Sequence, residues 1–162
     1  MNKPDNKKTL GREFALKFLF QLFIKDNAPF REAFVGGDVS AAELEERIMD
    51  FKESYMSPDD EHPDNQIDDG NFFFANKLLV SLSKEMNKVE ELVKQETKKE
   101  HLEHLEKIER CVLLVGTIEL TEFETPYQVV INEMVNLAKK YGGADSGRFV
   151  NGVLDGIRRK QK

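Results

Sequence analysis

The sequence predicts an all-α protein, a compact bundle of about six to seven helices. Apolar residues recur at three- and four-residue spacing through several long segments, which is the spacing of one face of an α-helix. Charged residues make up 33% of the chain and Trp is absent, a composition typical of helical proteins. The 162 residues, 40% of them hydrophobic, are enough for one core, so we expect residues 1–162 to form a single domain.

A first helix is predicted from about Thr9 to Lys25, and it is apolar around most of its circumference. A core-facing stripe normally covers about 100° of a helix, and this one covers more. The helix is therefore either central in the bundle or presents a second apolar face to another protein. Its polar row is Glu13, Lys17, Gln21 and Lys25, and its apolar rows are Phe14/Phe18/Leu22, Ala15/Leu19/Phe23 and Leu16/Phe20/Ile24.

Residues 26–70 form an acidic region, with fourteen acidic side chains against three basic ones. Its start, residues 27–38, contains a proline and a Gly pair and is predicted to be a connection. Ser40 and Glu43 form a capping box, which predicts a helix that ends at about Tyr55.

The second half of the chain predicts further helices, from about Asn71 to Thr97, from Leu102 to Phe123, and from Pro126 onward with Thr125 as the cap. The turn YGGADSGR that follows has the glycine spacing of a phosphate loop. A helix precedes this turn where a phosphate loop needs a strand, so no nucleotide site is implied.

The residues around this turn are interpreted as structural. Gly142 is expected to end one helix, and Asp145 or Ser146 to cap the next. A glycine inside a helix costs about 1 kcal/mol relative to alanine, so Gly152 predicts the close approach of another backbone. Side chains that tie neighbouring segments together are expected at Asn132, Glu133 and Asn151.

No catalytic constellation is recognised, and we expect no enzyme activity, cofactor or metal. Cys111 lies among apolar residues and is expected to be an inert core residue; as the lone cysteine it indicates a reducing cytoplasm. His101 and His104 are three apart, a spacing that allows shared metal coordination, but two exposed histidines are the favoured interpretation. No segment is long and apolar enough to predict a membrane span.

Both ends of the chain are basic, although the net charge is −6. Residues 1–12 carry four basic side chains against Asp5, and residues 156–162 carry four basic side chains and no acidic one. If the two ends meet in the fold, they form a basic patch.

Three motifs follow one another in the last third of the chain: IERCVLLVGTIEL at 108–120, PYQVVINE at 126–133 and NLAKKYGGADSGRFVNGVLDGI at 136–157. Together they resemble the NusB family of bacterial transcription antitermination factors, and residues 12–21 resemble its first helix more loosely. The resemblance implies a helical bundle that binds boxA-type RNA together with the small-subunit ribosomal protein that acts as NusE. It also implies a place in the RNA polymerase antitermination complex, which promotes processive transcription of ribosomal RNA operons.

The resemblance implies RNA contacts at the N-terminus. The basic segment of the family falls on Lys7, Lys8 and Arg12, while two further basic positions of the family are occupied by Thr9 and Leu10. Each lost phosphate contact weakens RNA binding and reduces its salt dependence. A modest RNA affinity is therefore expected.

A second RNA-facing turn of the family falls on Asp145, Arg148 and Phe149. Phe149 is expected to stack on an unpaired base, as single-stranded RNA recognition commonly requires. The alternatives are ordinary core packing for Phe149 and a helix cap for Asp145.

For the protein partner, the contact positions of the family fall on Phe20 and Glu109. Phe20 belongs to the extra apolar row of the first helix, so Leu16 and Ile24 of that row are included in the expected partner surface. Glu109 is either a rim ion pair or a solvated helix charge.

Two alternative functions remain open. A protein-only adaptor or a homodimer with weak RNA affinity fits the diluted basic segment and the acidic region. An RNA-modifying enzyme with a NusB-like domain is less favoured, because the chain has no glycine-rich strand–helix unit to hold a methyl donor.

Overall fold

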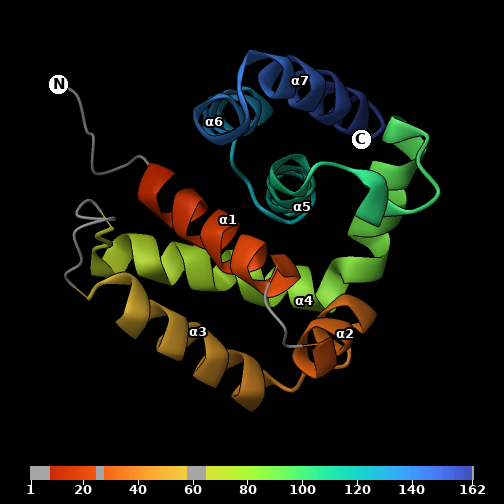
Figure 1. Ribbon diagram of the computed structural model, residues 1–162. Helices are drawn as coiled ribbons and strands as arrows, with labels where there is room; N and C mark the ends of the chain where they lie inside the picture. The colour runs from red at the N-terminus through yellow and green to blue at the C-terminus, as the bar shows by residue number, and fades with distance from the viewer. Residues whose placement is uncertain (1–7, 25–27, 58–64, 162) are drawn as a thin grey trace, which may run out of the picture.

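The computed structural model describes residues 8–24, 28–57 and 65–161 (Figure 1). Within these residues the chain is all-α, as predicted, with seven α-helices, one short 3₁₀-helix and no strand. The elements are α1 (Thr9–Ile24), α2 (Ala28–Gly36), α3 (Ala41–Tyr55), α4 (Asp69–Thr97), the 3₁₀-helix η2 (Leu102–His104), α5 (Lys107–Glu122), α6 (Tyr127–Gly142) and α7 (Ala144–Arg159).

Helix α5 is the centre of the bundle. Figure 1 shows it end-on, with α1 and α4 on one side and the α6–α7 pair on the other. Every residue from Cys111 to Glu119 is buried. A helix that is surrounded in this way needs apolar or paired side chains on all its faces, which explains why α5 lacks a polar stripe.

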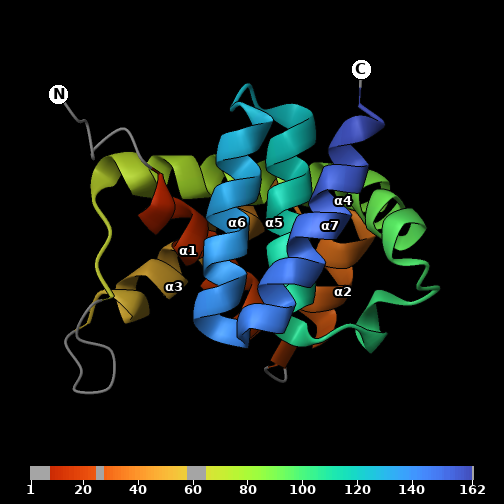
Figure 2. The same cartoon turned by 90° about the horizontal axis from the view of Figure 1, so that it is seen from above.

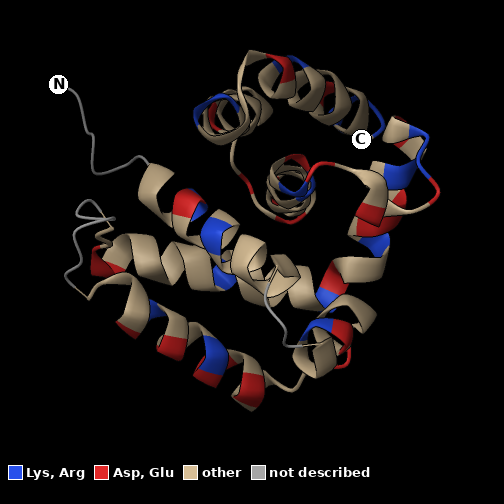
Figure 3. Cartoon of the chain, viewed as in Figure 1, with Lys and Arg blue, Asp and Glu red and all other residues tan. Residues whose placement is uncertain are grey.

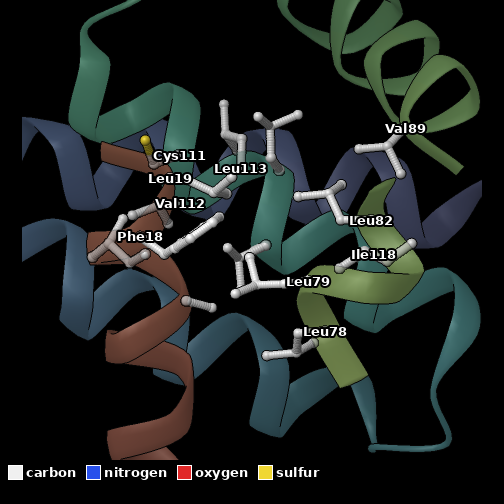
Figure 4. Close-up of a cluster of buried hydrophobic side chains, with 14 of the residues drawn as sticks. Phe18, Leu19, Leu78, Leu79, Leu82, Val89, Cys111, Val112, Leu113 and Ile118 are labelled. Atoms are coloured by element: carbon white, nitrogen blue, oxygen red, sulfur yellow. The ribbon is translucent and has the colours of Figure 1, made fainter. Parts of the chain in front are cut away.

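The core joins α1, α4 and α5. Figure 4 shows apolar side chains of these helices gathered between the ribbons, and the labelled residues are all buried. They are Phe18 and Leu19 of α1, Leu78, Leu79, Leu82 and Val89 of α4, and Cys111, Val112, Leu113 and Ile118 of α5.

Helices α1 and α4 make a close contact at Gly11. Its backbone N–H donates to Oδ1 of Asn71 over 2.8 Å. A Cβ atom at position 11 would lie 2.7 Å from the backbone oxygen of Asn71, so a side chain there has no room. The contact fixes the start of α1 against the start of α4.

The prediction that residues 27–38 form a connection is wrong, because they contain α2. Pro29 lies in the first turn of this helix, where a missing N–H costs no intrahelical hydrogen bond. Phe30 and Phe34, four residues apart, are buried and hold α2 on the bundle. The predicted cap of α3 is confirmed, since Ser40 Oγ accepts a 3.1 Å hydrogen bond from the N–H of Glu43.

The predicted helix over residues 71–97 is confirmed as a single element of 29 residues, α4, with a kink at Glu85 (φ −108°, ψ 19°). The residue after this helix, Lys98, adopts the left-handed conformation with φ 58° and ends the helix. The next helix starts later than predicted. Leu102 and Leu105 are buried, but Leu102 lies in η2 and Leu105 is an extended residue that follows η2. Helix α5 begins only at Lys107.

The α6–α7 turn differs in detail from its prediction. Helix α6 ends at Gly142 as expected, and Gly143 follows with φ +99°. Gly143 also precedes the first residue of α7, so neither Asp145 nor Ser146 is the cap residue. Pro126 is likewise the residue before α6 rather than its first helical residue, and Thr125 does not cap it.

The interpretation of Gly152 is wrong. A Cβ atom at this position would meet nothing within 4 Å, so no backbone approaches it. Asn151 and Asn132 are exposed rather than buried between segments. Glu133 does tie two segments together, because it accepts a hydrogen bond of 2.6 Å from Thr9 Oγ1.

Candidate functional site

A groove of about 600 Å³ lies along α1, and we call it the α1 groove. Leu16 is only 2% exposed and forms part of its floor, Phe20 is half-buried, and Ile24 is 50% exposed. The sequence predicts that Leu16 belongs to the partner-binding surface together with Phe20 and Ile24. This prediction is corrected for Leu16, because Leu16 is a core residue. The groove is lined by Leu16, Lys17, Phe20, Gln21 and Ile24 of α1, by Phe51, Ser54 and Tyr55 of α3, and by Asn65, Ile108 and Tyr141.

The α1 groove has a polar end built around Glu13. This carboxylate is buried and accepts hydrogen bonds from Tyr141 Oη and, over 2.7 Å, from Lys140 Nζ. Burial alone would raise the pKa of Glu13, but these hydrogen bonds and the positive charges of Lys140 and Lys17 together lower the pKa. Lys17 Nζ lies 5.4 Å from the ring centre of Tyr55 and 5.6 Å from that of Tyr141.

Sequence reasoning missed this polar end. The periodicity of α1 identifies Glu13 and Lys17 as a polar row, which normally indicates solvent exposure. The structure places Glu13 and Lys17 against the last turn of α6 instead. The signal available in the sequence was Tyr141, an aromatic residue at the end of a helix, but nothing in the sequence pairs it with Glu13.

Glu109 of α5 is half-buried and already has a partner in the chain. Ser146 Oγ donates a 2.8 Å hydrogen bond to Glu109 Oε2, which links the start of α5 to the first turn of α7. Its neighbour Ile108 lines the α1 groove. Glu109 is therefore close to the groove, and its contact with a partner stays a prediction.

Asp145, Arg148 and Phe149 lie together on the first turns of α7. Asp145 and Arg148 form an exposed ion pair, with side chains 94% and 74% accessible. Phe149 is half-buried and packs against the core with part of its ring at the surface. The helix thus presents an exposed cation beside a partly accessible aromatic ring, and the role of these residues stays a prediction.

The N-terminal residues predicted to bind RNA have different positions. Lys7 lies outside the described residues. Lys8 is partly exposed and lines a cavity of about 820 Å³ between the starts of α1, α4 and α6. Arg12 is 3% exposed.

Arg12 is held inside the chain by two carboxylates. Its Nε and Nη2 donate to the two oxygens of Glu119 over 2.8 and 2.6 Å, and its Nη1 lies 3.3 Å from Glu133 Oε1. Glu119 is fully buried. Withdrawing Arg12 to reach a phosphate would leave this carboxylate buried and unpaired, so we correct its assignment from RNA contact to structural ion pair.

The described parts of the two basic ends do not meet. Gly11 contacts Asn71 at the start of α4, whereas Lys160 forms a 2.5 Å ion pair with Glu96 near the end of α4. The charged residues of these helices are coloured in Figure 3. The two segments therefore lie at opposite ends of a 29-residue helix.

Other groups with potential chemistry have ordinary surroundings. Cys111 is buried, and burial raises the pKa of its thiol to about 12, which makes it a poor nucleophile. His101 and His104 are exposed, with ring centres 5.7 Å apart. Among the described residues no group of three or more metal-ligating side chains occurs. None of the described helices combines the length and apolarity that a membrane span requires.

Residues 9–159 match the model of the NusB family. The transcription antitermination protein NusB of Azoarcus sp. (strain BH72) is 64% identical over 55 residues, a match that covers 33% of this chain and 36% of that protein. The match to this curated relative thus spans about a third of its length.

Solved structures extend the likeness to the whole fold. T. maritima NusB superposes with a TM-score of 0.68 at 27% identity, covering 99% of this chain and 94% of the other. A chain from the crystal structure of the antitermination factors NusB and NusE in complex with double-stranded RNA gives a TM-score of 0.69 at 20% identity, with 93% of this chain and 95% of that chain covered. This likeness concerns the fold alone. Because the family model matches nearly the entire chain, this protein belongs to the NusB family.

Proposed function

We propose that this protein is a cytoplasmic transcription antitermination factor that binds boxA-type RNA together with the ribosomal protein that acts as NusE. On this proposal the pair joins the RNA polymerase antitermination complex and promotes processive transcription of ribosomal RNA operons. Family membership and the names of the relatives support the activity. The binding of the ribosomal protein is supported by the α1 groove, which offers a surface on which a second protein can dock.

The partner docks on the α1 groove. Ile24 is 50% exposed and Phe20 is half-buried, directly above a floor that includes Leu16. An apolar surface in a groove with a polar end is the usual anatomy of a protein interface, in which a buried apolar centre is surrounded by a polar rim. Glu109 lies beside Ile108 and contributes to that rim.

The RNA contacts Lys8 and the first turns of α7. Lys8, with Lys7 before it, neutralises phosphates, and Arg148 does the same when a phosphate competes with Asp145 for its guanidinium. The accessible part of Phe149 stacks on an unpaired base. Arg12 supports this surface through its ion pair with Glu119 and makes no contact of its own.

The partner part is tested with Phe20→Asp. If the partner removes water from the groove, a carboxylate in the centre of this apolar interface weakens binding by at least about 2 kcal/mol, which is about thirtyfold in Kd. Met49→Asp is the matched control, because Met49 of α3 is 45% exposed and is not among the residues that line the α1 groove. Calorimetric titration with the ribosomal protein should separate the two variants, and equal affinities would contradict groove docking.

The RNA part is tested by titrating boxA-type RNA at several salt concentrations, with and without the ribosomal protein. Lys8→Ala should weaken binding and reduce the slope of log K against log salt by about 0.7, the value for one phosphate contact on a single strand. If no RNA binds under either condition, the protein-only adaptor or homodimer is the better description. Sedimentation analysis of the chain alone then tells the adaptor from the homodimer.

A further inference from the structure

The cavity of about 820 Å³ next to Lys8 is large enough for a nucleotide, and we call it the α6 cavity. Its apolar walls include Phe74, Pro126 and Val129, and Val129 is 44% exposed. Two amide side chains, Gln128 and Asn132, also line it. Neither residue is needed for the fold as a buried tie, since both are exposed.

The wall behind the α6 cavity is rigid. Arg12 lies beneath it, fixed between Glu119 and Glu133, and its guanidinium sits 5.2 Å above the ring centre of Phe74. Thr9 Oγ1 donates to Glu133 over 2.6 Å, which attaches α1 to α6 at the cavity. These contacts fix the side of the cavity wall that α1 contributes.

The exposed face of α6 extends from this cavity toward α7. Gln128, Asn132 and Asn136 follow one another at four-residue intervals, and Lys139 comes next; all of them are exposed. The acidic residue within α6, Glu133, is engaged by Thr9 and Arg12. Glu133 also lines the α6 cavity, with its carboxylate already bonded. In a chain of net charge −6, the exposed polar side chains along this face are therefore amides and a cation, next to the apolar Val129.

The exposed face of α6 connects the two groups of residues that the proposed function assigns to RNA. Lys8 lies at its start, on the rim of the α6 cavity. At its end the side chain of Lys139 packs on α7, where a Cβ atom on Gly147 would lie 2.7 Å from Lys139 Cγ. Gly147 immediately precedes Arg148, and Figure 2 shows α6 between α1 and α7.

We propose that an unpaired nucleotide of the bound RNA inserts its base into the α6 cavity, where Gln128 and Asn132 read the edge of the base. The inference rests on the proposed RNA binding and adds a site of base recognition to it. A primary amide carries both a donor and an acceptor, so two amides one helical turn apart can satisfy a base edge. The apolar wall accepts the face of the base, Lys8 holds the adjacent phosphate, and the strand continues along α6 to Arg148 and Phe149.

The test uses the double variant Gln128→Ala/Asn132→Ala, with Asn87→Ala/Gln95→Ala as the matched control. The control also removes two exposed amides, from the second half of α4. Affinity for boxA-type RNA, measured by fluorescence anisotropy, should fall about tenfold in the test variant, the size of one lost base-edge contact, and stay unchanged in the control. The salt slope should not change, because no charge is removed.

A set of RNAs with single abasic positions identifies the inserted base. One position should weaken wild-type binding about tenfold and have little further effect in the test variant, because both changes remove the same contact. Thermal melts establish that the variants fold, and Asn132→Asp, which places a negative charge in the cavity, should weaken RNA binding independently.

Three results would overturn the inference. If the test variant binds RNA as tightly as the wild type while Lys8→Ala does not, the RNA avoids the α6 cavity and the proposed function survives. If the test variant loses affinity for the ribosomal protein but not for RNA, the cavity is a protein site. If the wild type binds no RNA with or without the partner, the inference and the RNA part of the proposed function fall together.

Discussion

The buried ion pair between Arg12 and Glu119 predicts that Arg12 stabilises the fold and does not contact RNA. We consider Arg12→Met, which keeps a long side chain and removes the charge. The guanidinium of Arg12 is 3% exposed and Glu119 is fully buried, with two hydrogen bonds of 2.8 and 2.6 Å between them. The variant leaves the Glu119 carboxylate buried without its cation.

Removing one partner of a buried ion pair costs about 3–5 kcal/mol of unfolding free energy. For a domain of this size each kcal/mol corresponds to about 2–4 °C, so Tm should fall by about 6–20 °C. The double variant Arg12→Met/Glu119→Leu removes both charges and should recover most of that loss, since apolar replacements of buried ion pairs are often neutral. Glu133 keeps its hydrogen bond from Thr9 in both variants.

The assay is thermal and urea unfolding followed by far-UV circular dichroism, together with RNA titration at a temperature where every variant is folded. Folded Arg12→Met should bind RNA with the salt slope of the wild type. A loss of less than about 1 kcal/mol, combined with a salt slope lowered by about 0.7, would restore Arg12 as a phosphate contact and refute the reasoning.

Three further predictions concern stability. Gly152→Ala should raise the unfolding free energy by up to about 1 kcal/mol in urea titrations, because the new methyl group meets nothing within 4 Å and alanine favours the helix. Gly11→Ala should lower the unfolding free energy by about 1–3 kcal/mol, because the new Cβ atom would overlap the backbone of Asn71, which cannot move aside like a side chain. If Gly11→Ala and Gly152→Ala were equally stable, the close packing of α1 on α4 would be contradicted. Burial raises the pKa of Glu90 and outweighs the attraction of Arg110, so folding favours the protonated acid. The contribution of Glu90 to the free energy of unfolding is therefore present below its unfolded pKa and is lost as pH rises through the raised folded pKa. Glu90→Gln should therefore raise Tm at pH 7 and lose this advantage near pH 4, and a pH-independent difference between the two melting curves would reject burial as the cause.

Local patterns were sufficient to predict most of the helices. The period of apolar residues marked α1, α4 and α6, and the Ser40 hydroxyl identified the start of α3, because a helix and its cap are decided by residues within a few positions of one another. The same local rules failed at α2, where Pro29 suggested a connection. Its place in the first turn is compatible with a helix, and the burial of Phe30 and Phe34 against the bundle decided the outcome.

The candidate site was accessible to sequence reasoning only in part. The surplus apolar row of α1 indicated a second surface, and Phe20 and Ile24 do line a groove. The turn before α7 was identified as a turn between helices, but its glycine and hydroxyl residues have roles in the fold that spacing did not reveal. Ser146, for example, bonds Glu109 rather than capping its own helix.

Tertiary structure alone decided the fate of the polar residues. The sequence predicts that Arg12 is an exposed basic residue, but the fold places Glu119, 107 positions away in the sequence, against it. Glu13 reads as a solvent-facing residue until Tyr141, 128 positions away, donates to it. A polar side chain is stable inside a protein only when a partner satisfies it, and that partner is set by the packing of distant helices, which the local period of a sequence does not encode.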